Sequence, residues 1–147
     1  MALGMIEGAE ARGELIEGMS VVEYSGGSTG ASLAFICAIK GYHFHIISGD
    51  CFGQEKLDTM NAFGADLEVI KSPDGKITAE VIQSMIDRAA ELAENENYYF
   101  TDQLNNTDII HGFKKLGEEG VKYEVERTGT GPRTDYMVAA EDTVLPT

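Results

Sequence analysis

A glycine-rich stretch with three hydroxyl side chains is the part of the chain whose residue types best suit chemistry. Residues 25–30 read Ser-Gly-Gly-Ser-Thr-Gly, and they follow an apolar run containing Val21 and Val22. A turn of this kind between a strand and a helix aims unpaired backbone N–H groups at one point, where the helix dipole also favours negative charge. The stretch therefore predicts a pocket for a small anion, such as a carboxylate or a phosphate.

The same residues have a second interpretation that needs no ligand. Glycines allow a strand and a helix to pack closely through a tight turn, and a hydroxyl at the start of a helix caps its N–H groups. The stretch alone favours neither interpretation over the other.

The elements that must position this stretch alternate between strands and helices. Short apolar runs predict strands at residues 20–24, 43–48, 67–70, 98–101 and 135–140. Helical periodicity predicts helices at residues 1–16, 29–40, 54–63, 78–94 and 107–119. This alternation is typical of βαβ units. The sequence predicts an α/β fold, a three-layer α/β/α domain with a mostly parallel sheet of about four strands.

Three segments make up the predicted domain organisation. Residues 1–19 form an N-terminal helix, and residues 20–118 form an α/β domain that contains the glycine-rich stretch. Residues 119–147 form a divergent C-terminal linker and strand, because Gly120, Gly129, Gly131 and Pro132 interrupt any regular pattern there.

Composition and charge narrow the classes of function. The chain has 147 residues and a formal net charge of -14, which argues against nucleic acid or an anionic membrane as a partner. No stretch is long and apolar enough to span a bilayer. Cys37 and Cys51 form no metal or redox motif, and Cys37 lies in an apolar helical pattern typical of a core thiol. A reduced, cytoplasmic setting is the simplest account.

Two histidines alternate on a predicted strand. His43 and His45 point to one face of that strand, as a pair of metal ligands would. The sequence offers no third ligand for them, so it predicts a partly exposed pair at the end of the sheet and no metal site.

Several separated motifs resemble one family of enzymes. In chain order these are Met-Ile-Glu-Gly-Ala-Glu at residues 5–10, the glycine-rich stretch, Ala-Ile-Lys-Gly-Tyr at 38–42, Glu-Lys-Leu-Asp-Thr-Met at 55–60, Phe-Gly-Ala-Asp at 63–66, and Asp-Gln-Leu-Asn-Asn at 102–106. Their order and spacing resemble the cysteine synthase and cystathionine β-synthase family, pyridoxal-phosphate enzymes of fold type II. The resemblance covers about residues 2–116, and it implies the Rossmann-like small domain that grips the substrate.

The resemblance also implies roles for individual residues. In the family, a loop resembling Thr-Ser-Gly-Asn-Thr-Gly binds the substrate α-carboxylate, and its Asn contacts the ring hydroxyl of the cofactor. Here the residues implied in carboxylate binding are Ser25, Gly26, Gly27, Thr29 and Gln103, and the residue implied in cofactor binding is Ser28. Gly26 stands where the family has Ser, and Ser28 stands where it has Asn. The alternative for Gln103 is a polar residue at a strand end that bonds the loop backbone.

Two parts of the family pattern are missing from the sequence. The Schiff-base lysine of the family lies just before the helix that starts at Met1, and none of the seven lysines here falls in a matching context. The family's phosphate-binding loop follows a strand like the one at residues 135–140, whereas here Glu141 and Asp142 follow and would repel a phosphate. We therefore expect no catalytic residue in this chain and no stable binding of pyridoxal phosphate by it alone.

Three hypotheses about function remain open at this point. The first is a partial cysteine synthase-like domain, from pyridoxal-phosphate-dependent β-replacement in amino-acid biosynthesis, that keeps the carboxylate loop and is inactive alone. The second is one part of a split transferase or lyase that another chain completes. The third is a noncatalytic module for small anions or protein interaction. The expected partners are a small amino acid or other small anion and either a second copy, through residues 1–16 and 136–140, or a complementary chain.

Overall fold

The computed structural model describes residues 1–128, which form five helices and four strands. In chain order the elements are α1 (Ala2–Arg12), β1 (Ser20–Tyr24), α2 (Ser28–Lys40), β2 (His43–Gly49), α3 (Gln54–Ala62), β3 (Asp66–Ile70), α4 (Ala79–Ala93), β4 (Tyr98–Phe100) and α5 (Asp108–Thr128). The strand predicted at residues 135–140 lies outside the described residues.

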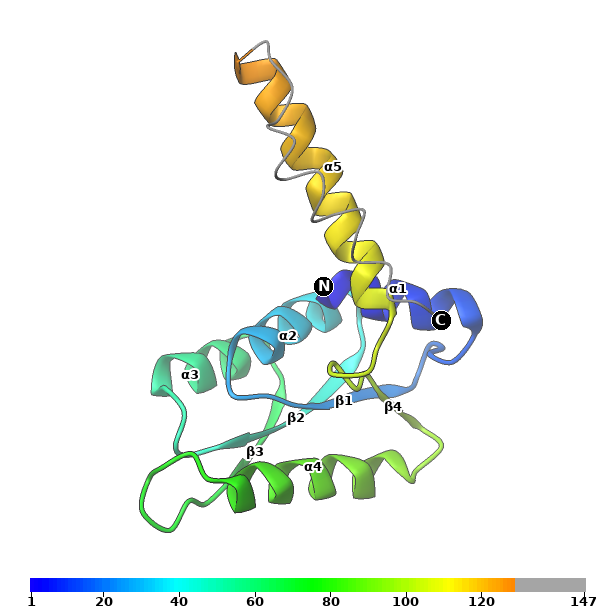
Figure 1. The fold of residues 1–147 in the computed structure, drawn as a ribbon. Helices are drawn as coiled ribbons and strands as arrows, with labels where there is room; N and C mark the ends of the chain where they lie inside the picture. Colours follow the sequence, from blue (N-terminus) through cyan, green and yellow to red (C-terminus); the bar gives the residue numbers. More distant parts are fainter. Residues whose placement is uncertain (129–147) are drawn as a thin grey trace.

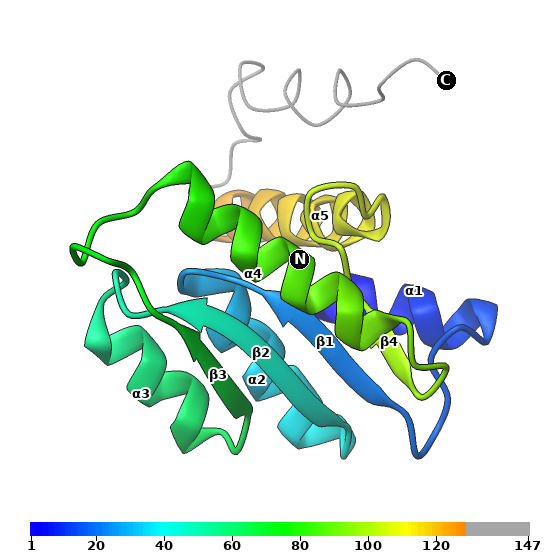
Figure 2. The same cartoon turned by 90° about the horizontal axis from the view of Figure 1, so that it is seen from below.

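The four strands form one parallel sheet in the order β3-β2-β1-β4. In register, Tyr24 of β1 lies beside Ile47 of β2, and Val22 lies beside Phe100 of β4. Helices α1, α2 and α3 lie on one face of the sheet, and α4 covers the other (Figure 1, Figure 2). This arrangement confirms the predicted three-layer α/β/α fold.

Alternation along β1 divides the hydrophobic core between the two faces. Val21 packs in a cluster with the buried faces of α1, α2 and α3, whereas Val22 packs with Val81 and Met85 of α4. Each large apolar side chain buried in this way contributes roughly 1.5–3 kcal/mol to stability. The predicted core thiol, Cys37, is buried in the first cluster, and burial raises its pKa to about 12.

Helices α1 and α5 end several residues away from their predicted ends, whereas the other helices end within one residue of theirs. Helix α1 stops at Arg12 and not at residue 16, because Gly13 takes a left-handed conformation (φ 73°) and its N–H bonds the carbonyls of Ala9 and Glu10. Helix α5 continues to Thr128, nine residues beyond the predicted end at Glu119. The sequence in between contains a single glycine and no proline, and one glycine costs a helix only about 1 kcal/mol relative to alanine. No helix within residues 1–128 combines the length and the hydropathy needed to cross a bilayer.

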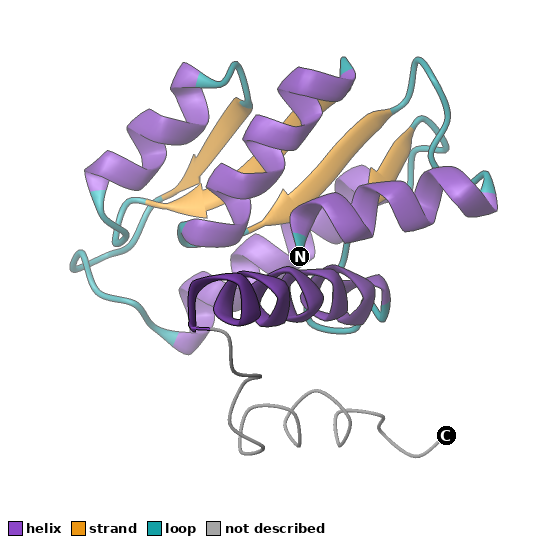
Figure 3. Ribbon diagram, turned by 90° about the horizontal axis from the view of Figure 1, so that it is seen from above, coloured by secondary structure: helices purple, strands orange, loops and turns teal. Residues whose placement is uncertain are grey.

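Helix α1 crosses the start of α5 at very short range (Figure 3). A methyl group on Gly4 would lie 2.7 Å from the Asp108 carbonyl oxygen, and one on Gly8 would overlap the Asp108 carboxyl group. Arg12 closes the crossing, because its Nη1 lies 2.9 Å from Asp108 Oδ1 and 2.8 Å from Oδ2. The apolar side of α1, including Met5, is thus covered within the chain, which removes one reason to expect this helix in a dimer contact. The homodimer itself stays a prediction.

The close contact between α1 and α5 predicts that alanine has opposite effects on stability at Gly8 and at Gly117. Gly8→Ala should lower the free energy of unfolding by about 1–3 kcal/mol, since the added methyl group forces Asp108 away from Arg12. Gly117→Ala, on α5 where no atom lies within 4 Å, should cause no loss and up to about 1 kcal/mol of gain. Urea denaturation of both variants measures the two effects, and equal stabilities would show that the crossing tolerates a side chain.

Candidate carboxylate-binding site

The order of the strands places two loops at a point where ligands bind in open parallel sheets. From β1 the chain passes through α2 to β2 on one side, whereas β4 lies on the other side of β1 and is reached through α4. The loops that leave the carboxyl ends of these two adjacent strands therefore emerge side by side, at the edge of the sheet where ligands of open parallel sheets bind. The glycine-rich stretch follows β1, and Gln103 follows β4, so the fold brings the two parts of the predicted site together.

Ser25 folds the glycine-rich loop from inside. Its side chain is buried, and its Oγ accepts hydrogen bonds from the N–H groups of Gly27 (3.2 Å) and Gly30 (3.1 Å). The Ser25 hydroxyl therefore takes the capping role of the second interpretation and satisfies two of the orphan donors at the start of α2. Ser28 and Thr29, in the first turn of α2, are left to present their N–H groups to an anion.

Two glycines of the loop are required by close packing. The ring of Phe52 occupies the space that a side chain on Gly26 would take. A methyl group on Gly30 would lie 2.6 Å from Met60 Sδ and 3.2 Å from Ser25 Cβ. Gly26 stands where the resemblance implies a serine, and the Phe52 ring, from the loop between β2 and α3, packs against it.

Lys56 lies nearer the loop than its sequence context indicates. It belongs to the first turn of α3 and is exposed, as expected of a solvated lysine. The aliphatic part of its side chain lies over Gly27, since a methyl group there would be 3.2 Å from Lys56 Cγ. A lysine stem can cover backbone in this way while the ammonium group stays in water.

Gln103 is fixed to the end of β1 through both its backbone and its side chain. Its Nε2 donates a hydrogen bond to the Tyr24 carbonyl oxygen at 3.0 Å, and its backbone N–H donates to Glu23 Oε2, also at 3.0 Å. The first contact is the backbone bond that the sequence offered as an alternative for this residue. An amide nitrogen carries two hydrogens, so the second can still serve a ligand.

Glu23 lies outside the predicted set of site residues, although it joins the two loops. It is fully buried, and its Oε1 accepts a hydrogen bond from the Tyr24 N–H (2.8 Å). Its Oε2 accepts from Thr101 Oγ1 (2.6 Å) and from the Gln103 N–H. Burial raises the pKa of Glu23, and these hydrogen bonds oppose that rise. The sequence pattern could have pointed to Glu23, because it is an acid inside a mostly apolar strand. A central parallel strand is buried on both faces, so an acid there needs partners within the protein.

The two histidines of β2 are engaged with different partners. His43 Nδ1 lies 3.2 Å from Ser20 Oγ, and His45 Nε2 lies 3.3 Å from Glu68 Oε2. Glu68 also receives Arg88 Nε at 2.8 Å, and this hydrogen bond lowers the pKa of Glu68. Among the described residues, no three His, Cys, Asp or Glu side chains are grouped as a metal ion would need.

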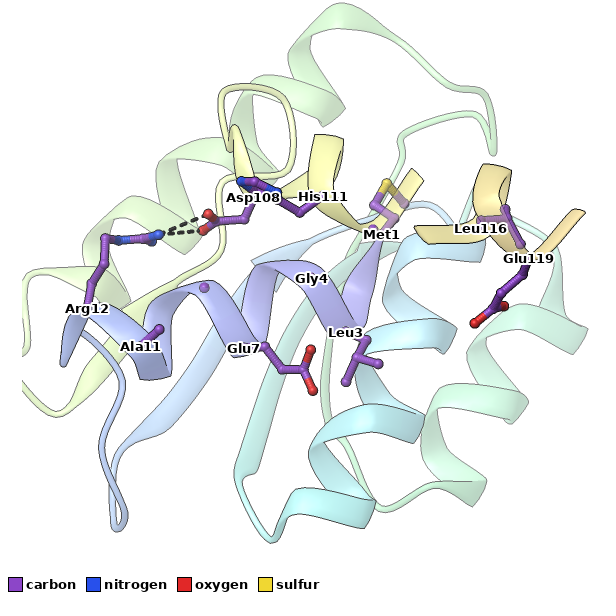
Figure 4. A pocket seen from close by; sticks show the side chains of 12 residues that line it. Met1, Leu3, Gly4, Glu7, Ala11, Arg12, Asp108, His111, Leu116 and Glu119 are labelled. Carbon is purple, nitrogen blue, oxygen red and sulfur yellow. Dashed lines mark hydrogen bonds and ion pairs between the residues drawn. The ribbon is translucent and has the colours of Figure 1, made fainter. Parts of the chain in front are cut away.

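A separate groove of about 720 Å³ lies between α1 and α5 (Figure 4). Leu3 and Glu7 line it from α1, His111 and Leu116 line it from α5, and the Arg12–Asp108 pair borders it. The residues of this groove belong to neither loop of the candidate site.

Comparison with known proteins identifies the family. Residues 1–141 match the sequence model of the family described as "Pyridoxal-phosphate dependent enzyme", and the chain belongs to this family. It is 36% identical over 106 residues to a cysteine synthase of Staphylococcus aureus, covering 72% of this chain and 32% of the relative. It is 36% identical over 107 residues to cysteine synthase B of Escherichia coli, covering 73% of this chain and 33% of the relative. The chain thus spans about a third of the length of these curated relatives.

Solved structures agree with this assignment. A hydrogen sulfide-producing enzyme of Fusobacterium nucleatum superposes with a TM-score of 0.71 at 27% identity, over 82% of this chain and 38% of that one. An O-ureido-L-serine synthase superposes with a TM-score of 0.72 at 26% identity, over 88% of this chain and 38% of that one. The resemblance seen in the motifs is confirmed, and the chain is a partial cysteine synthase-like domain of this pyridoxal-phosphate-dependent family.

The described residues fit pyridoxal phosphate only in part. Ser28 is exposed at the start of α2, where its hydroxyl suits a polar group on the cofactor ring. Of the lysines whose surroundings are described, Lys40, Lys71 and Lys76 form ion pairs with carboxylates. Lys56 alone of these has its stem beside the loop. The donor set therefore suits a carboxylate and one ring contact, but it does not complete a cofactor site.

The packing of Phe52 on Gly26 predicts a non-additive pair of substitutions. Gly26→Ser should lower the free energy of unfolding by about 1–3 kcal/mol, because the new side chain collides with the Phe52 ring. In a chain that also carries Phe52→Ala, Gly26→Ser should lower the free energy of unfolding by less, and the coupling between the two substitutions should be about 1 kcal/mol. A double-mutant cycle by thermal unfolding measures this coupling, and additive effects would mean that the ring moves aside freely.

Proposed function

We propose that the chain binds the α-carboxylate of a small amino acid, as the substrate-gripping part of a cysteine synthase-like β-replacement enzyme. The observation that carries the proposal is the loop folded by Ser25, which leaves the N–H groups of Ser28 and Thr29 at the start of α2, while Gln103 is bonded to Tyr24 where the same loop begins. Membership of the family supports it, and so do relatives named for the synthesis of cysteine and of O-ureido-L-serine.

Each group of the site has a physical task in this proposal. The two N–H groups of α2 donate hydrogen bonds to a carboxylate at the positive end of the helix dipole. Gln103 Nε2 adds its second hydrogen from the opposite loop, and the Ser28 hydroxyl would hold a polar group of the cofactor ring. Pyridoxal phosphate supplies the electron sink for replacement at the side chain of the amino acid when it is bound.

Catalysis requires groups from outside these 147 residues. In this proposal a lysine and a phosphate-binding loop come from the remainder of a longer protein or from a complementary chain. Support comes from the span of the match, about a third of the curated relatives. Exposed apolar side chains on α5, such as Phe113 and Leu116, are consistent with a further part packing against this domain.

The proposal predicts weak binding that depends on a carboxylate. Addition of L-serine should shift the amide NMR signals of Ser28, Thr29 and Gln103 most strongly, with a dissociation constant on the order of millimolar. L-Serinamide, which lacks the carboxylate, should leave these signals unchanged. Gln103→Leu should weaken the binding of L-serine, whereas Gln83→Leu, at an exposed glutamine of α4, should not. If the largest shifts fall away from both loops, the proposed site is wrong.

A second expectation concerns the cofactor. The purified chain mixed with pyridoxal phosphate should show no lasting absorbance band of a lysine-bound cofactor, because no described lysine is held in a site built for that bond. Borohydride reduction followed by peptide mass spectrometry should find no lysine labelled in preference to the others. Selective labelling of Lys56, lost in Lys56→Arg, would show instead that the chain supplies its own lysine.

A further inference from the structure

We infer that Glu23 is a positioning residue for ligand binding, a buried carboxylate that holds the loop after β4 in place against the loop after β1. The inference rests on the proposed function, because the loop that Glu23 holds is the one that carries Gln103. Glu23 touches no ligand in this account. It acts through the backbone of Gln103 and through Thr101.

Three donors from two segments converge on this one carboxylate. Tyr24 N–H belongs to the end of β1, whereas Thr101 Oγ1 and the Gln103 N–H belong to the segment that follows β4. The carboxylate is fully buried, so water cannot replace a lost partner without a rearrangement. When Glu23 is ionised, these hydrogen bonds are stronger than neutral ones and link the two loops.

The backbone at Asp102, between Thr101 and Gln103, has an unusual conformation. Asp102 lies between Thr101 and Gln103 and has a φ of 43°, in the left-handed region that residues other than glycine rarely adopt. This conformation lets the groups on either side of Asp102 reach the same oxygen of Glu23. Such a conformation persists only where surrounding contacts hold it, and Glu23 supplies two of them.

Thr101 has two acceptors for a single hydrogen. Its Oγ1 lies 2.6 Å from Glu23 Oε2 and 3.5 Å from the Val22 carbonyl oxygen. When Glu23 is ionised, the hydroxyl donates to the carboxylate; when Glu23 is neutral, the carboxyl group must itself donate, and the Thr101 hydroxyl turns to Val22. Protonation of Glu23 therefore reverses this hydrogen bond and leaves the Gln103 N–H with a neutral, weaker acceptor.

The groups around Glu23 determine the direction in which its pKa is shifted. Burial raises its pKa, the nearby charge of Asp102 adds to this rise, and Tyr24 is the other titratable neighbour. Because the folded-state pKa lies above the ordinary 4.5, stability from this group is fully present below that value and is lost as pH rises through the folded-state pKa. Relative to Glu23→Gln, the natural chain should therefore lose stability as pH rises above about 4.5 and through the folded-state pKa of Glu23.

The test compares ligand affinity and amide signals in matched variants. Glu23→Gln should weaken the binding of L-serine by about tenfold, equivalent to about 1.4 kcal/mol. Thr101→Val should weaken it in the same direction, and Thr101→Ser, which keeps the hydroxyl, should restore it. The control is Glu68→Gln, which removes a carboxylate of β3 that holds Arg88 of α4 and should change affinity by less than about twofold.

A pH titration of the natural chain measures directly whether the protonation of Glu23 is felt in both loops. As pH changes, the amide NMR signals of Tyr24 and Gln103 should shift together, with one midpoint above the ordinary carboxyl range. This shift should be absent from the spectra of Glu23→Gln. Equal L-serine affinity in the natural chain, Glu23→Gln and Thr101→Val would overturn the inference and leave the proposed function standing. Failure of the natural chain to bind L-serine at all would overturn both. If Glu23→Gln does not fold, the Thr101 variants and the titration still decide.

Discussion

The central strand β1 imposes the constraint on which the rest of this structure depends. It pairs with β2 on one edge and β4 on the other, and both of its faces are covered, so four of its five residues are buried. Polar groups at such a strand must find partners within the protein. Glu23 and Ser25, at its carboxyl end, meet this requirement by accepting the donors of the two loops that leave the sheet there.

The same constraint brings together the two loops of the proposed carboxylate site. The loops after β1 and β4 leave the carboxyl edge of the sheet from adjacent strands, and hydrogen bonds from Gln103 link them. The first turn of α2 begins at this edge, with N–H groups and the positive end of a helix dipole. In the proposed function this edge of the sheet receives the carboxylate, whereas the reaction requires a cofactor and groups from outside this domain.

The departures from the family loop are best understood through packing. A side chain at position 26 would meet Phe52, and the stem of Lys56 lies over Gly27. The loop is therefore covered by residues of the β2–α3 region, which contribute bulk where the family pattern has a hydroxyl. Sequence spacing alone does not show this, since Gly26 and Phe52 are 26 positions apart and meet only because β1 and β2 are neighbours.

The sequence by itself determined the architecture and the place of the glycine-rich loop. Strands and helices followed from periodicity, and the family followed from motifs in a fixed order, because both are carried by local residue types. Tertiary structure decided what the polar side chains do: Ser25 caps the loop, Gln103 bonds the Tyr24 backbone, and Glu23 ties the loops together. The partners of Gln103 and Glu23 lie about 80 positions away along the chain. Such contacts exist only once β1 and β4 pair, so no local pattern can encode them.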